Sequence, residues 1–428
     1  MFAGAFMMGA KDRLLPPSVP YRFFATAVVL HCAGWAALLA GAEDVPGFLG
    51  GLGPALAGLH LMTLGVLAMT AIGAAFQLLP VATRRQLGPV WACRLTWWLY
   101  APGVAALGLG LATAAPWALH AGAALTVAGL ALFGVLVARN LVQVTDLPAV
   151  TLHVWLSLAS LAALAALGVA LVVDIDVGIL GDRAATAAAH AVLGGYGFMG
   201  MLALGFSYVL VPMFVLARPV PDRAGRVTAT VSLLALGLGA GGALAGQGPV
   251  AALGGLAGLA AVALHLKALA ETLKTRMRKK LEPFFRLLKA AWALLPASLL
   301  AGIALALGAP ADMAAPLWGF LLVFGWLLSF VTGLLQRIMP FLASMHSGAE
   351  GRKPALLSEL TAARPLAVHA ACHGVAVVLI VVGLVASLPL AVTAGAAMGL
   401  AGALSFAVFA VELMRRYRAH LKSHTPQG

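Results

Sequence analysis

A stretch of 21 residues, HLMTLGVLAMTAIGAAFQLLP from His60 to Pro80, recurs twice along this chain. Its frame has two glycines, fifteen and seven residues before a proline. The three copies are Gly65, Gly73 and Pro80; Gly197, Gly205 and Pro212; and Gly325, Gly333 and Pro340. The second copy follows the first by 132 residues, and the third follows the second by 128. Self-similarity at a near-constant interval indicates repeated structural units, so the chain is predicted to contain three units of about 130 residues.

The composition is that of a membrane protein. Apolar residues make up 62% of the 428 residues and charged residues only 10%, whereas a soluble globular protein is about half apolar and a quarter charged. No signal peptide is expected, because the basic residues of the first stretch follow its apolar residues. The net charge of +13 is explained by membrane topology, so no nucleic-acid partner is predicted.

Apolar segments define the architecture, since a helix that crosses a bilayer needs about 20 apolar residues. Cutting at charges, prolines and glycine clusters gives twelve segments, at about 22–42, 55–80, 91–113, 117–138, 151–173, 185–216, 227–246, 249–269, 288–308, 316–343, 365–386 and 389–414. The repeated frame falls in the second, sixth and tenth, so each unit has four helices. We predict an all-α polytopic membrane protein with 12 transmembrane helices in three pseudo-repeated four-helix arcs. The repeats cover about 20–145, 146–283 and 284–416, and a cytoplasmic tail covers 417–428.

Positive charge predicts the orientation, because Arg and Lys accumulate on the cytoplasmic side of membrane proteins. With the N-terminus inside, 26 of the 27 basic residues fall on the inner side and only Arg183 falls outside. Both termini are then cytoplasmic. The predicted location is the bacterial cytoplasmic (inner) membrane, with the lipid bilayer as the chief partner.

The repeated glycines predict how the helices pack. Residues eight apart lie on nearly one face of a helix that turns by about 100° per residue. Membrane helices associate through such small residues, so the second, sixth and tenth segments are predicted to be the inner helices of the three arcs. The proline of each copy is expected to end or kink its helix near the inner surface.

Two histidines lie at nearly equal depth below the outer surface, His60 on segment two and His190 on segment six. Ionisable groups inside a membrane are costly and indicate function, and imidazole is a good ligand for haem iron or another metal. The alternative is a pair of core histidines satisfied by nearby carbonyls or hydroxyls. If both rings face one space, a haem there would take one axial ligand from each, and Gly65 and Gly194 would make room. Otherwise His60 points away and pairs with segment eleven or one.

A second histidine group lies deeper. His369 and His373 are four residues apart on segment eleven and share a helix face. His31 lies near mid-membrane on segment one, and His346 closes segment ten. This set could hold a second haem or a copper ion, or it could be a polar network that packs helix ends.

Three further histidines, His120, His153 and His265, lie at segment ends. There an amphipathic ring needs no special cause.

Together these features resemble subunit I of the haem-copper oxidases, in which twelve helices form three arcs and helix two carries an early histidine. The endings GFSYVLVP and, less closely, GAAFQLLP are similar to the ending of helix two in that family. A histidine about six turns before that proline is a low-spin haem ligand there, and the matching position here is His60. The resemblance implies haem b as the cofactor and copper as a further candidate.

Departures from that family are as informative as the match. Helix ten of the oxidases carries a His-x-His pair, but segment ten here has no such pair, segment seven lacks the His-His pair that binds copper, and no His-Pro-Glu-Val-Tyr run is found. The chain is therefore not expected to be a working oxygen reductase. It is more similar to short relatives of the superfamily, such as the NnrS-type haem-copper membrane proteins linked to nitric oxide response.

The predicted function is a non-oxidase haem-binding membrane protein in electron transfer or in redox and nitric oxide handling. Its partner would be a redox protein or a quinol. Two alternatives stay open. One is a copper or small-molecule transporter that uses the deeper histidines as its path, and the other is a structural or assembly subunit without a cofactor.

Overall fold

The computed structural model describes residues 14–348 and 353–423. All regular structure in these two ranges is helical, and twelve of the helices are long and apolar enough to cross a membrane. The all-α class and the twelve predicted segments are confirmed. The spans are Ser18–Ala40, Pro54–Thr83, Val90–Thr113, Pro116–Leu141, Pro148–Val177, Arg183–Val215, Asp222–Leu244, Gly248–Lys274, Phe285–Ala306, Ala311–Ser347, Ala363–Val385 and Pro389–Ser423.

The spans form three sets of four. The first set contains α2 (Ser18–Ala40), the composite helix α3–η2–α4 (Pro54–His60, Leu61–Ala68, Met69–Thr83), α5 (Val90–Thr113) and α6 (Pro116–Leu141). The second contains α7 (Pro148–Val177), α8–η3–α9 (Arg183–Val192, Leu193–Gly200, Met201–Val215), α10 (Asp222–Leu244) and α11 (Gly248–Lys274). The third contains α12 (Phe285–Ala306), α13–η4–α14 (Ala311–Phe320, Leu321–Leu328, Ser329–Ser347), the short α15 (Leu357–Leu360), α16 (Ala363–Val385) and α17 (Pro389–Ser423).

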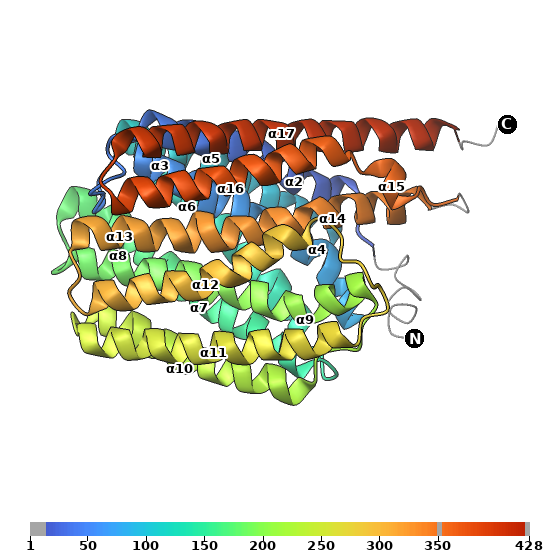
Figure 1. The fold of residues 1–428 in the computed structure, drawn as a ribbon, viewed down its shortest axis with the longest axis horizontal. Helices are drawn as coiled ribbons and strands as arrows, with labels where there is room; N and C mark the ends of the chain where they lie inside the picture. The colour runs from blue at the N-terminus through green and yellow to red at the C-terminus, as the bar shows by residue number, and fades with distance from the viewer. Residues whose placement is uncertain (1–13, 349–352, 424–428) are drawn as a thin grey trace.

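The long helices run side by side along the longest axis of the molecule, with α16 and α17 at one edge and α10 and α11 at the other (Figure 1). The third and fourth helices of each set form a tightly packed hairpin. A methyl group at Gly122 would lie 2.2 Å from the backbone nitrogen of Leu107, and one at Gly254 would lie 2.3 Å from that of Gly239. Small residues thus let these backbones touch, as packing inside a membrane requires.

The composite helices lie inside the bundle. In their most apolar windows 83%, 89% and 83% of the residues are buried, against 50% or less in the other nine spans of the described chain. The prediction that segments two, six and ten are inner helices is confirmed. Large apolar side chains are exposed on the outer helices, such as Trp98 at 63% and Val378 at 61%. Lipid rather than water suits such a surface.

Each inner helix widens into an eight-residue π-helical turn at the same place in the repeat. The first glycine of the frame is the fifth residue of each turn: Gly65 in η2, Gly197 in η3 and Gly325 in η4. η4 contacts both η2 and η3. Turns of this kind are rare in proteins, and those that occur are often at functional sites. The centre of the bundle is therefore the expected position of a functional site.

The second glycine of the frame packs against the first helix of its own set. A methyl group at Gly73 would lie 2.8 Å from Cβ of Phe23, and one at Gly205 would lie 2.8 Å from Cβ of His153. At Gly333 the nearest atom would be Cδ1 of Leu288, 2.7 Å away. The same contact is therefore built three times, and it shows which residues of different sets correspond.

The repeat proline was expected to end or kink its helix near the inner surface. It lies inside the helix, three residues before the end, since α4 continues from Pro80 to Thr83 and α9 from Pro212 to Val215. These helices stop where the next residue, Arg84 or Leu216, has a left-handed backbone with φ of 56° or 54°. Proline is tolerated inside membrane helices in general, because neighbouring groups can satisfy the backbone carbonyl that it leaves free. The last helix continues to Ser423, so 417–423 of the predicted tail are helical.

Candidate functional site

The outer pair of histidines is brought together. The ring centroids of His60 and His190 are 6.5 Å apart and their planes differ by 30°. His60 is the last residue of α3, directly before η2, and His190 lies three residues before η3. Of the two arrangements predicted from the sequence, this placement has both rings facing a common space.

Both rings are oriented by backbone carbonyls. Nδ1 of His60 lies 3.0 Å from the carbonyl oxygen of Leu56, and Nδ1 of His190 lies 3.2 Å from that of Leu164. A carbonyl oxygen only accepts, so each Nδ1 carries the proton and donates it. Each Nε2 is left with a free lone pair, which is the state in which an imidazole binds a metal ion.

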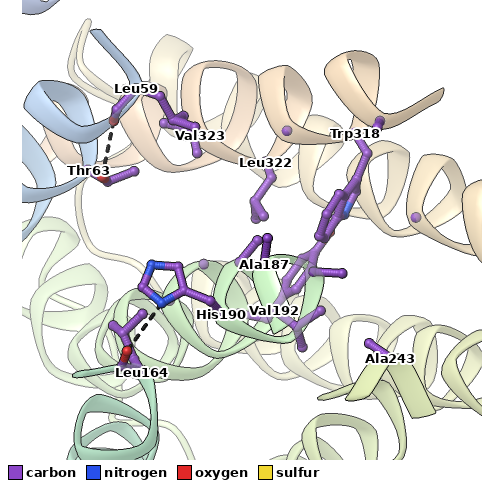
Figure 2. Close-up of a pocket in the computed structure, with 18 of the residues that line it drawn as sticks. Leu59, Thr63, Leu164, Ala187, His190, Val192, Ala243, Trp318, Leu322 and Val323 are labelled. Atoms are coloured by element: carbon purple, nitrogen blue, oxygen red, sulfur yellow. Dashed lines mark hydrogen bonds between the residues drawn. The ribbon is translucent and has the colours of Figure 1, made fainter. Parts of the chain in front are cut away.

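The pair lines a cavity of about 1240 Å³ at the N-terminal halves of the inner helices. Ligand pockets are usually about 300–1,000 Å³, so this one is large enough for a macrocycle. Figure 2 shows His190 projecting toward the space bordered by Thr63 and Leu322, with its ring held by Leu164 and with Trp318 on the far side. The lining is chiefly apolar.

The third set supplies aromatic rings where the others have histidines. Trp318 follows His190 by 128 residues, and Phe320 follows His60 by 260, which is the sum of the two repeat intervals. Both rings line the cavity. Trp318 is turned toward Tyr196, because its Nε1 donates to the phenol oxygen over 3.2 Å.

The geometry of the outer pair fits a metal held between two imidazoles. Two metal–nitrogen bonds of about 2.0 Å, with about 1 Å from each nitrogen to its ring centre, would separate the centroids by roughly 6 Å. The observed 6.5 Å agrees with that value. The large apolar cavity and the free Nε2 atoms suit a haem better than a bare ion, which needs more ligands.

One expectation about this site is wrong. Gly65 does not make room beside the histidines, because a methyl group there would meet Leu30 of α2 at 2.8 Å. The π turn and close packing on α2 account for this glycine. Gly194 does line the cavity, and its nearest neighbour would be Leu164 at 3.3 Å.

Of the four histidines predicted to form a second group, three lie close together: His31, His369 and His373. The rings of His31 and His369 are 5.8 Å apart, and those of His369 and His373 are 5.9 Å apart. All three are buried, with exposures of 2%, 1% and 3%. His31 accepts a hydrogen bond from Trp35, His373 pairs with the Ser329 hydroxyl at 2.8 Å, and Nδ1 of His369 donates to a carbonyl. Nε2 of His369 and Nδ1 of His373 have no partner.

His346 stands apart from that group. It lies seventeen residues beyond Ser329 on α14, which is on the order of 25 Å along a helix. It therefore cannot share a metal with His373, which contacts Ser329. Among the described residues, no three His, Cys, Asp or Glu side chains converge as a metal site would require.

A third cluster was missed by sequence reasoning. His153 and His265 were expected at membrane interfaces, yet their exposures are 0% and 1%, and both rings pack against Tyr208. By contrast, His120 is exposed and pairs with Asp176 at 2.7 Å. The repeat could have indicated this cluster. Tyr208 stands four residues before the repeat proline, at the position where the first copy has Phe76, so an inner helix has a polar ring where its counterpart has an apolar one.

The fold has a counterpart among solved structures. The chain is similar to a haem-copper terminal oxidase whose dimer was solved by cryo-electron microscopy, with a TM-score of 0.62 and 14% identity over 96% of this chain and 84% of that one. No family model matches the chain, and no curated protein matches it. At this identity the likeness shows the fold alone, so the chain is a multi-pass membrane protein with the fold of a haem-copper oxidase chain.

Proposed function

We propose that this chain is a non-oxidase membrane protein that binds a b-type haem between His60 and His190 and transfers electrons. The observation that carries the proposal is the placement of two imidazoles 6.5 Å apart at the edge of one large apolar cavity. The likeness to an oxidase fold agrees with it. The NnrS-type relatives are the proposed branch.

The residues around His60 and His190 would orient the two imidazoles and enclose the haem. The carbonyls of Leu56 and Leu164 fix the tautomer and the direction of the two imidazoles. The apolar lining excludes water from the ring, and the aromatic side chains of the third set close the far wall. Tyr196 is held by Trp318 and Ser298, over 3.2 and 3.0 Å, so the wall is rigid.

If His60 and His190 together held a haem, the group would supply one-electron transfer. The carbonyls of Leu56 and Leu164 would keep both imidazoles directed at it, which favours electron transfer over the binding of nitric oxide. Electron transfer is therefore the better supported of the two roles. The donor in this proposal is a redox protein or a quinol.

The non-oxidase part rests on the residues of the third set and of α10. α10 contains no histidine, and Trp318 and Phe320 occupy the level at which the other sets carry His190 and His60. We expect the purified protein not to reduce oxygen at oxidase rates with a reduced donor. Sustained oxygen uptake would overturn this part alone.

The experiment is a reduced-minus-oxidised absorption spectrum of the purified chain, with elemental analysis of iron and copper. We expect a low-spin b-type spectrum and one haem at this site. His60→Ala and His190→Ala should each abolish six-coordinate haem, because each removes one of the two imidazoles that would hold the group. His120→Ala is the matched control, since that histidine is exposed and pairs with Asp176.

The outcomes separate the alternatives. Six-coordinate haem that survives His190→Ala would move the second ligand to His31, His369 or His373. Copper bound in stoichiometric amount without haem would favour the transporter. Purified protein with neither would favour a structural or assembly subunit and overturn the proposal.

A further inference from the structure

Three buried rings form a polar cluster in the second set, away from the outer cavity. His153 of α7 packs on Tyr208 of α9 with centroids 5.3 Å apart, and Tyr208 packs on His265 of α11 at 5.2 Å. Nδ1 of His265 lies 3.1 Å from the phenol oxygen of Tyr208. The exposures of the three residues are 0%, 5% and 1%.

The first set has the same three rings without polar atoms. Phe23 packs on Phe76 at 5.6 Å and 85°, where His153 and Tyr208 pack at 5.3 Å and 86°. Phe76 packs on Phe133 at 5.7 Å and 52°, where Tyr208 and His265 pack at 5.2 Å and 45°.

The correspondence of the residues is independent of the rings. Gly73 meets Phe23 as Gly205 meets His153, and Phe76 and Tyr208 both stand four residues before the repeat proline.

The fold therefore does not need polar side chains at these positions. Buried imidazoles and phenols cost free energy unless they are partnered. His153 donates its Nδ1–H to the carbonyl of Ala149 over 2.7 Å, and its Nε2 is buried without a partner. An unpaired buried acceptor of this kind calls for an explanation such as a bound ion.

We propose that His153, Tyr208 and His265 form a binding site for a divalent transition-metal ion of the class of Cu²⁺. Imidazole and phenol oxygen are ligands for such ions, and Cu²⁺ has the highest affinity in the first-row series. Two donors bonded to one metal at about 2.0–2.2 Å lie about 3 Å apart, and the nitrogen of His265 and the oxygen of Tyr208 are separated by 3.1 Å.

The site has features that a metal centre needs beyond its ligands. The carbonyl of Ala149 orients His153, as outer partners of metal-bound histidines do. The cluster lies near one end of the bundle, because His153 is five residues after the start of α7 at Pro148 and His265 is nine residues before the end of α11 at Lys274. An ion would enter from that end. Binding would release the phenol proton of Tyr208 to solvent.

The test replaces the trio with the side chains of the first set. The triple variant His153→Phe, Tyr208→Phe, His265→Phe should fold, since the same rings already pack in the first set. Equilibrium titration with Cu²⁺ should show one site fewer than in the wild-type chain, and each single variant should weaken that site on the order of 100-fold or more. His120→Phe, at an exposed histidine, is the control and should leave the titration unchanged.

Two further readouts keep the test decisive. Electron paramagnetic resonance of bound Cu²⁺ should show coupling to two imidazole nitrogens, and to one in either single histidine variant. Tyr208→Phe alone serves if the triple variant does not fold. The haem spectrum should survive all these changes, which separates this site from the one at His60. An unchanged Cu²⁺ titration in the triple variant, or no saturable binding by the wild type, would overturn the proposal.

Discussion

The first two sets of helices and the third present different side chains to one cavity. His60 and His190 belong to the first and second sets, and the third set has Phe320 and Trp318 at the corresponding level. All three inner helices have the π turn and the glycine contact with the first helix of their set. The backbone therefore sets where side chains meet, and the residue type alone decides which set presents an imidazole to the cavity.

The first two sets are alike at the cavity, but they differ at the level of the second frame glycine, Gly73 and Gly205. Here the first set is apolar, with Phe23, Phe76 and Phe133, whereas the second set carries two histidines and a tyrosine in the same ring geometry. At this level only the second of these two sets has rings with polar atoms. Because the sets share a backbone, each provides a natural control for the others.

The largest expected effect tests whether the third set can replace a lost ligand. Trp318→His in the His190→Ala background should not restore six-coordinate haem. Trp318 points at Tyr196, with Nε1 to Oη at 3.2 Å, so a histidine there is not directed at His60. The measurement is haem retained after purification and its low-spin absorption, and we expect loss on the order of the whole haem content.

Trp318→Phe with both histidines intact is the control for that variant and should keep its haem. Recovery of the low-spin spectrum by Trp318→His would contradict the expectation that the third set cannot supply the missing imidazole. It would mean that position in the repeat, rather than side-chain direction, selects the ligand.

The sequence predicted most of the fold because each signal was long and redundant. Twelve apolar segments and a frame repeated three times specify helices, arcs and inner positions without any knowledge of contacts. The π turns were not predictable, since they change helical phase without altering hydropathy. That change also explains the misplaced role of Gly65, which faces Leu30 on α2.

The pairing of buried histidines was predictable only where their depth along the helices decided it. His60 and His190 were paired from equal depth and opposite phase, and the structure places their rings 6.5 Å apart. His153 and His265 were missed because they stand near segment ends, where the sequence does not tell a lipid-facing ring from one facing Tyr208. His346 was grouped with His373 by residue type alone. It lies seventeen residues along α14 from Ser329, which contacts His373, so the two histidines are far apart.

A smaller effect is expected from adding a methyl group where the sets are most alike. Gly205→Ala places Cβ 2.8 Å from Cβ of His153, and Gly73→Ala places it 2.8 Å from Cβ of Phe23. Overpacking of this kind costs about 1–3 kcal/mol, so both variants should unfold at lower temperature than the wild type, by similar amounts.

Gly237→Ala is the matched control in a helix of the second set, because a methyl group there would have no neighbour within 4 Å. Its melting temperature should equal or exceed that of the wild type. A loss confined to Gly205→Ala would show that the polar cluster, and not the shared packing, limits stability in the second set.

The smallest expected effect concerns the hydroxyl groups that bond to the π turns. Tyr100 donates to the carbonyl of Leu64 in η2 over 3.0 Å, and Ser157 donates to that of Phe198 in η3 over 2.8 Å. Tyr100→Phe and Ser157→Ala each remove one hydrogen bond from a carbonyl that also accepts a backbone N–H at the end of its turn. Hydrogen bonds between membrane helices contribute about 0.6 kcal/mol on average, so a loss of that size or smaller is expected. Thermal unfolding and amide exchange in the π turns measure the loss, and Thr230→Val, at an exposed threonine that bonds to its own helix, is the control. Equal small losses would mean that both turns depend on their hydroxyl group to the same extent. Faster exchange in η2 alone would mean that only the turn of the first set, next to His60, depends on its hydroxyl group.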